Sequence, residues 1–145
     1  MKYSLADYTV AIKFNDPQLQ ADLGAISIGG EGKYTDSISA SYTNNQWQTD
    51  TFATGGWVHN KNLSRAGAVS ITLSQLSEQV SKFKQICNNY YSKDYSGMTI
   101  TISDNSLNPV CICEDCYIEQ IPEQSFASAA GRQTWRFVAG NIVFY

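Results

Sequence analysis

A strand pattern runs directly into a helix pattern in the stretch Ala66-Gly67-Ala68-Val69-Ser70-Ile71-Thr72-Leu73-Ser74-Gln75-Leu76-Ser77 and the residues that follow it. Up to Leu73, apolar residues alternate with small or polar ones, which is typical of a strand with one buried face. Ser74 is then in the position of an N-cap. Beyond it, one apolar stripe recurs at spacings of four, three, four and three residues, through Leu76, Val80, Phe83, Cys87 and Tyr90. This stretch therefore predicts a strand followed by a helix at about residues 75–90.

Alternating patterns on both sides of this stretch predict further strands. They are expected at residues 8–14, 23–28, 37–42, 46–53, 98–104 and 110–121, the last as one long strand or a bent pair. A hairpin is expected at 132–145, with a turn or bulge at Gly140-Asn141. Turns are expected at residues 15–17, 29–32, 43–45 and 105–109, an exposed loop at 54–65, and a loop with small residues at 122–131. The chain is therefore predicted to be mainly β, an antiparallel β-sandwich or half-barrel with one flanking α-helix. Its length favours a single domain over residues 1–145.

The charge and the apolar content of the chain argue against three classes of protein: nucleic-acid-gripping, secreted and membrane-spanning. The formal net charge is −3, and the longest basic feature is Lys82 with Lys84, which does not make the basic patch of a nucleic-acid-gripping domain. Residues 1–8 lack the apolar segment of a signal peptide. No apolar run approaches the roughly 20 residues of a membrane span. We therefore expect the chain to fold and assemble in the cytoplasm and not to bind membranes on its own.

Three of the four cysteines lie close together in sequence, as Cys111, Cys113 and Cys116. In a cytoplasmic chain the thiols are expected to be reduced. A structural zinc site needs four ligands, and because the only histidine, His59, is far away in sequence, Cys87 would have to be the fourth. The favoured interpretation is a set of small residues on a strand and its turn, with no metal and no cofactor, and the zinc site is the alternative.

Candidate catalytic residues are few. A cysteine–histidine pair would need His59 beside a cysteine, and His59 lies in a predicted loop without any surrounding signature. Glu114 and Asp115 are adjacent, so on a strand they are expected to point to opposite faces and not to form a pair. The glycine-rich segment at residues 29–32 lacks the lysine and the Ser/Thr of a phosphate-binding loop. The sequence therefore does not predict an enzyme.

Two motifs are the most specific parts of the chain: the strand-to-helix step GAVSITLSQLS at residues 67–77 and the segment GRQTWRF at residues 131–137. A strand near Tyr8, a glycine-rich bend and a polar stretch with Gly55-Gly56 precede the first motif. The segments Ile100–Asp104 and Ile118–Pro122 lie between the two motifs. Neither motif is catalytic. In their order and spacing, over nearly the whole chain, these features resemble the tail tube proteins of contractile-tailed phages and related particles. The cysteine-rich segment 111–116 departs from that pattern.

The resemblance implies a virion structural protein. Proteins of this kind fold as a β-sandwich or half-barrel with one flanking helix, a fold shared with the tube of type VI secretion. Hexameric rings stack into a hollow tail tube, the strands of neighbouring subunits join into its wall, and the tube conducts DNA during ejection. The implied partners are further copies of the chain, the tail sheath, baseplate and tail terminator proteins, and the tape measure protein and DNA in the lumen.

We expect the contacts between subunits in segments that contain large aromatic residues but lack the alternation of apolar and polar residues. The predicted inter-subunit residues are Tyr42, Trp47, Phe52, Trp57, His59 and Arg65. The competing interpretation packs the aromatic residues of segment 43–65 onto their own sheet as a loop that closes the fold. Two other functions stay open: another tail ring component, such as a terminator or baseplate protein, and a β-sandwich carbohydrate-binding module with Trp47 and Trp57 as its platform.

Overall fold

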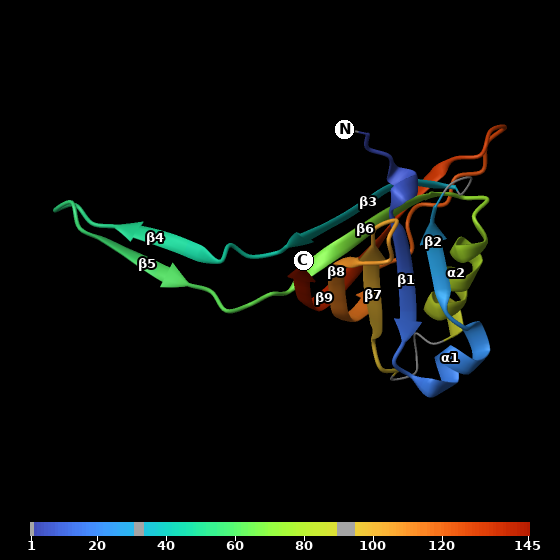
Figure 1. Ribbon diagram of the computed structural model, residues 1–145, viewed down its shortest axis with the longest axis horizontal. Coiled ribbons are helices and arrows are strands. Elements are labelled where there is room, and N and C mark those ends of the chain that lie inside the picture. Colours follow the sequence, from blue (N-terminus) through green and yellow to red (C-terminus); the bar gives the residue numbers. More distant parts are fainter. Residues whose placement is uncertain (1, 31–33, 90–94) are drawn as a thin grey trace.

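Seven antiparallel strands form one sheet that curls into a half-barrel (Figure 1). The computed structural model describes residues 2–30, 34–89 and 95–145. The strand order is β2-β1-β7-β8-β9-β6-β3. The bounds are Thr9–Phe14 for β1, Ile26–Gly29 for β2, Thr35–Tyr42 for β3, Gly67–Ser74 for β6, Met98–Ser103 for β7, Pro109–Ile118 for β8 and Arg132–Phe144 for β9. The prediction of a mainly β half-barrel is confirmed.

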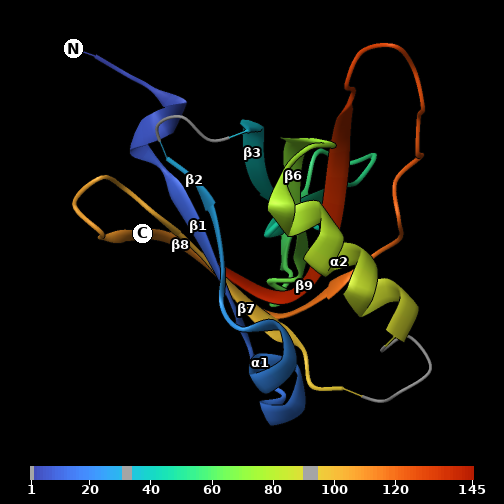
Figure 2. The same cartoon turned by 90° about the vertical axis from the view of Figure 1, so that its right-hand side faces the viewer.

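Helix α2, Glu78–Asn89, lies against the concave side of the curled sheet (Figure 2). Its inward residues Val80, Phe83 and Ile86 are at most 3% exposed. The ring of Phe83 lies 5.3 Å from the rings of Trp135 and Phe137, both on β9. The predicted flanking helix is therefore confirmed, and the core of the protein lies between this helix and the sheet.

The apolar stripe predicted for the helix is correct only in its middle. Leu76 is 66% exposed, Cys87 is half-buried, and Ile86 takes the inward position that the stripe gave to Cys87. The helix begins at Glu78, because Ser74 does not cap it: its Oγ accepts a hydrogen bond from the Leu76 N–H at 3.3 Å and closes a turn before the helix. Tyr90, the last residue of the stripe, lies outside the described residues.

A second helix, α1 at Pro17–Leu23, was not predicted; it follows the predicted turn, where residues 15 and 16 form a bend, and it takes the start of the predicted strand at residues 23–28. Asp16 is its N-cap and accepts a hydrogen bond from the Gln18 N–H at 2.9 Å, while Pro17 occupies the first turn, where its missing N–H costs nothing. Leu19 is fully buried, which anchors the helix. The predicted bend at residues 29–32 begins with Gly29 and Gly30, both at φ 96°, and residues 31–32 lie outside the described residues.

The C-terminal segment is one strand, β9, and not the predicted hairpin. Glu114 of β8 faces Asn141, and Cys113 faces Ile142, so pairing continues through the expected turn at Gly140-Asn141. A local irregularity does occur there, because the buried positions change phase from Ala139 to Ile142. A chain reversal at this point would separate Ile142, which is fully buried, from its partner on β8.

A two-stranded hairpin projects from the half-barrel (Figure 1). Its strands are β4, Trp47–Thr51, and β5, Trp57–Lys61, and we call residues 43–66 the arm. The predicted strand at 46–53 is confirmed, whereas the loop predicted at 54–65 is wrong because it contains β5. Every residue of both strands is exposed, so the sequence carries no alternation of buried and exposed positions that could have revealed β5.

Candidate functional site

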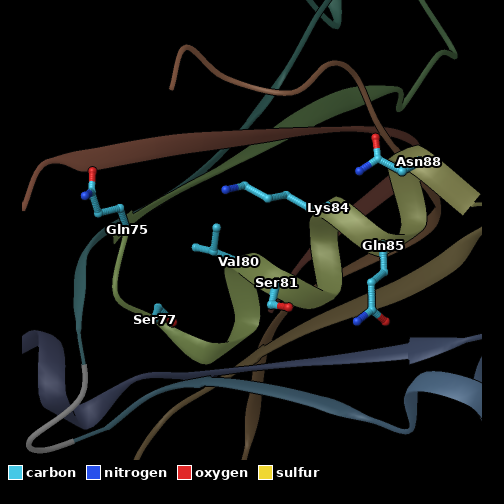
Figure 3. A pocket seen from close by; sticks show the side chains of 7 residues that line it. All are labelled: Gln75, Ser77, Val80, Ser81, Lys84, Gln85 and Asn88. Atoms are coloured by element: carbon cyan, nitrogen blue, oxygen red, sulfur yellow. The ribbon is translucent and has the colours of Figure 1, made fainter. Parts of the chain in front are cut away.

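A shallow hollow of about 340 Å³ lies beside α2 (Figure 3). It is lined by Gln75, Ser77, Val80, Ser81, Lys84, Gln85 and Asn88. These side chains supply amides, hydroxyls and one ammonium group. The lining contains no carboxylate, thiol or imidazole to exchange a proton with Lys84 or to act as a nucleophile. This hollow is therefore a surface feature without catalytic machinery.

The clustered cysteines point into the core. Cys111, Cys113 and Cys116 are at most 3% exposed, and the Sγ atoms of Cys111 and Cys113 lie 3.7 Å apart. Burial raises the pKa of all three thiols, that of Cys116 to about 12, so the metal-binding thiolate form is disfavoured. In the described parts of the chain, no three His, Cys, Asp or Glu side chains are gathered so that they could hold a metal ion. The arrangement suits inert core packing.

The raised thiol pKa values predict a loss of stability in alkaline solution. In the unfolded chain a thiol ionises near its ordinary pKa of 9.0, whereas burial holds Cys116 protonated up to about 12. Stability is therefore fully present below pH 9.0 and decreases above it, by about 1.4 kcal/mol per pH unit for each of Cys113 and Cys116. Urea unfolding at pH 8 and pH 10.5 measures the difference. Cys113→Ala should be less stable at both pH values but lose less between them, and equal losses in the two proteins would contradict the prediction.

The other candidate catalytic residues are not brought together. His59 lies on the arm, where its Nδ1 is 2.8 Å from the hydroxyl oxygen of Thr49, while the cysteines lie in the core of the half-barrel. The expectation that Glu114 and Asp115 point to opposite faces is wrong. Asp115 has φ 55° and forms a bulge in which both side chains are exposed, and the bulge returns Cys116 to the inward face. No catalytic pair results.

The arm has two chemically different faces, set by the pairing of β4 with β5. One face, which we call the aromatic face, carries the pairs Trp47 with Lys61, Thr49 with His59, and Thr51 with Trp57. Trp47 and Trp57 are 57% and 66% exposed, and the Lys61 Nζ lies 5.8 Å from the centre of the Trp47 ring. The opposite face is more polar, with Asn60 Nδ2 donating to Asp50 Oδ2 at 2.7 Å. The arm therefore presents an amphipathic surface.

The structure places the six predicted inter-subunit residues on or beside the arm, but in different environments. Trp47, Trp57 and His59 share the aromatic face, and Phe52 lies at the tip. Arg65 is exposed at the root. Tyr42 instead contacts its own chain: its hydroxyl donates to the Ile142 carbonyl at 2.8 Å, and its ring packs edge-on against Phe144 at 5.4 Å. The competing idea of a loop folded back onto its own sheet is wrong, since the arm extends away from the sheet (Figure 1).

One further exposed aromatic residue, outside the arm, was not predicted as a contact residue. Phe126, in the segment between β8 and β9, is 93% exposed. It lies among small residues, in the sequence Ser125-Phe126-Ala127-Ser128-Ala129-Ala130. The only signal in the sequence is this isolated phenylalanine in a small-residue loop. We call residues 119–131 the 119–131 loop, and in Figure 1 it rises at the end of the molecule opposite the arm.

The convex side of the sheet is rich in hydroxyl groups. Across β3, β6 and β9 it carries Ser37, Ser39, Ser41, Ser70, Thr72 and Thr134. The hydroxyl oxygens of Thr72 and Thr134 lie 2.9 Å apart. Two arginines on this side are paired with carboxylates, Arg132 with Asp36 at 3.3 Å and Arg136 with Glu119 at 3.2 Å. This surface is therefore polar but close to neutral.

Comparison with known proteins gives one family and a set of similar structures. A family model described as "Bacteriophage PhiTE tail tube protein" matches residues 2–144. No curated protein sequence matches the chain. Among the described residues, no helix combines the length and the apolar character that a membrane crossing needs.

The similar solved structures come from contractile injection systems. A chain of the PVC sheath-tube complex in the extended state has a TM-score of 0.60 at 12% identity, over 99% of this chain and 91% of that one. A chain of the PVC sheath/tube terminator has a TM-score of 0.58 at 12% identity, over 100% and 97%. A chain of the anti-feeding prophage baseplate has a TM-score of 0.58 at 9% identity, over 100% and 96%. At such low identity, these likenesses establish the fold.

Proposed function

Because this chain belongs to the phage tail tube protein family, we propose that it is the subunit of a tail tube, in which hexameric rings stack into a hollow cylinder that conducts DNA during ejection. The chain is a structural protein and not an enzyme. The observation that carries the proposal is the arm with its exposed aromatic face. A two-stranded hairpin is at best marginally stable alone in water, so a projecting one with exposed indole rings favours a partner surface.

The two edges of the sheet support the closure of a ring. Among the described residues, β3 pairs only with β6 and β2 only with β1, so both edges present backbone groups to solvent. Exposed edges are prone to pair with other chains. Pairing of the β3 edge of one copy with the β2 edge of the next is a heterologous contact, which closes into a ring when the rotation permits. The strands of neighbouring copies would then form a continuous wall.

The convex hydroxyl-rich surface of β3, β6 and β9 suits the lumen. A phosphate backbone binds tightly to unpaired basic side chains, and here Arg132 and Arg136 are each neutralised by a carboxylate. The formal charge of −3 per chain adds up to about −18 in a hexameric ring, which repels DNA and does not retain it. Hydroxyl groups offer weak, exchangeable hydrogen bonds. This wall would let DNA, and before it the tape measure protein, slide through the tube.

The remaining partners follow from the position of a tube in a tail. We place the sheath protein around the tube and the baseplate and terminator proteins at its two ends, with assembly in the host cytoplasm and the product in the virion tail. The similar structures support this placement, since they come from sheath-tube, terminator and baseplate assemblies. The same likeness keeps a second role open, a terminator or baseplate ring. Such a protein would form single rings, whereas a tube subunit forms long stacks.

The arm variant Trp47→Ala with Trp57→Ala tests the proposal. We expect wild-type protein at high concentration to form rings or hollow tubes with sixfold symmetry, and the double variant to lose the stacking of rings. Buried interface tryptophans commonly contribute about 2 kcal/mol or more each. Negative-stain electron microscopy and sedimentation velocity measure the assemblies. Thermal unfolding should be nearly unchanged, because both indole rings are exposed in the single chain.

Val58→Ala is the matched control, because Val58 pairs with Asp50 on the opposite face of the same hairpin. It should assemble as the wild type does. Tubes of normal length in the double tryptophan variant would show that the aromatic face does not join rings. A wild-type chain that remains monomeric at every concentration would instead oppose the tube assignment and favour the carbohydrate-binding alternative, with Trp47 and Trp57 as an open platform.

A further inference from the structure

We propose that the 119–131 loop of a neighbouring copy is what binds the aromatic face of the arm, with Phe126 seated against the two indole rings and Glu123 beside Lys61. This inference rests on the proposed tube function and names the partner surface of the arm. Two exposed features of one chain would thereby complete each other, the aromatic face with its tryptophans at 57% and 66% exposure and the phenylalanine at 93%.

The placement of the two surfaces favours a contact between successive copies. The arm extends from one end of the longest axis of the molecule, and the 119–131 loop rises at the other end (Figure 1). A chain cannot bring its own loop to its own arm in this arrangement. Contact between unlike surfaces at opposite ends is heterologous, and it propagates from copy to copy when it does not close on itself. That is the geometry that stacking requires.

The charges of the two surfaces are complementary. The 119–131 loop contains Glu119 and Glu123 and no basic residue. Glu119 is already paired with Arg136 at 3.2 Å, which leaves Glu123, an exposed side chain, as the carboxylate for the partner. On the arm, Lys61 lies on the aromatic face, whereas the carboxylate of Asp50 is on the opposite face and bonded to Asn60. The aromatic face is therefore cationic where the loop is anionic.

The shape of the loop suits an aromatic anchor. Alanine and serine residues flank Phe126, so its ring can approach the arm without bulky neighbours. The base of the loop is held by Gln124, whose Nε2 donates to the Pro122 carbonyl at 2.8 Å and whose Oε1 accepts from Gln133 Nε2 at 3.0 Å. Such anchoring lowers the entropy lost on binding. Aromatic rings that meet edge-on or offset gain more than their buried area alone.

Charge reversal with rescue tests the pairing. Lys61→Glu and Glu123→Lys should each raise the critical concentration for tube formation roughly tenfold or more, because each puts like charges face to face. The combined variant should return to within about threefold of wild type, since the pair is restored in reverse. Light scattering against protein concentration measures this. Lys84→Glu, the same charge change on α2, is the control and should assemble normally.

Disulfide trapping supplies an independent readout. Thr51→Cys, on the aromatic face beside Trp57, should form a disulfide with Ser125→Cys of the next copy when assembled tubes are oxidised, and a ladder of covalent oligomers should appear. Thr51→Cys combined with Ser81→Cys on α2 should not.

The outcomes separate the two proposals. This inference would be overturned if the wild type forms tubes but charge reversal is not rescued, Phe126→Ala assembles normally and no ladder forms. The tube function would then stand. Wild-type protein that never assembles would overturn both. Rescue together with the ladder would establish the 119–131 loop as the partner of the arm.

Discussion

Replacement of Phe83 by alanine is expected to destabilise the protein by about 3–5 kcal/mol. Phe83 is fully buried, and its ring lies 5.3 Å from the rings of both Trp135, in a tilted arrangement, and Phe137, in an edge-on arrangement. Its removal leaves a cavity between the helix and the concave side of β9. Urea unfolding followed by tryptophan fluorescence measures the loss, because Trp135 reports directly on this contact.

Leu76→Ala is the matched control for Phe83→Ala. Both positions belong to the apolar stripe that the sequence predicts, but Leu76 is 66% exposed and precedes the helix. Its truncation should change the free energy of unfolding by no more than about 0.5 kcal/mol. Comparable losses for the two variants would show that the helix begins earlier, near residue 75, and that the stripe is buried over its whole length.

Gly67→Ala is expected to have the second large effect on stability. Overpacking typically costs about 1–3 kcal/mol, and the loss here should reach or exceed the upper end of that range. A Cβ on Gly67 would lie 2.1 Å from the backbone carbonyl oxygen of Ser41 and 2.6 Å from Cδ1 of Ile142. Because the closer of these atoms belongs to the backbone, β3 and β6 would have to separate. This happens where the arm leaves the sheet, since Gly67 pairs with Tyr42 at the root.

Gly131→Ala controls for the loss of glycine itself. A Cβ there would lie 3.5 Å from the side-chain oxygen of Gln75, an ordinary contact distance. Thermal unfolding of both variants measures stability, and the assembly assay reports whether the arm keeps its direction. Gly67→Ala should lose both stability and tube formation, whereas Gly131→Ala, at the end of the 119–131 loop, should keep its stability. A Gly67→Ala protein as stable as the wild type would show that the two strands can move apart at little cost.

Expectations from the sequence are correct where the pattern is local. The alternation that ends at Leu73 gives β6, in which Val69, Ile71 and Leu73 are at most 1% exposed. The helix after it is present because Val80 and Phe83 recur at helical spacing. The mistaken helix start has a local cause as well: Ser74 closes a turn with Leu76 when it does not cap a helix, and both arrangements have the same sequence signature.

Other errors arise where a segment depends on a distant partner. The turn chemistry of Gly140-Asn141 is real, but pairing of Asn141 with Glu114 keeps β9 continuous. The Asp115 bulge exposes two adjacent carboxylates and turns Cys116 inward. It lies where the pairing register between β7 and β8 shifts. The sequence pattern did not predict β5, because neither face of this strand is buried in a single chain. In the first two cases the deciding contact lies far away in the sequence, and in the third no buried face marks the strand.

For this protein, the sequence by itself determined the mainly β class, the flanking helix, the low charge and the identity of the aromatic residues that now stand on the arm. These properties depend on composition and on spacing within about a dozen residues, which the chain carries before it folds. Only the tertiary structure decided that Trp47 and Trp57 share one face, that Tyr42 is tied to Ile142, and that the arm and Phe126 lie at opposite ends of the molecule. Strand register and the direction of a projecting hairpin are set by hydrogen bonds between segments remote in sequence, and local patterns do not encode them.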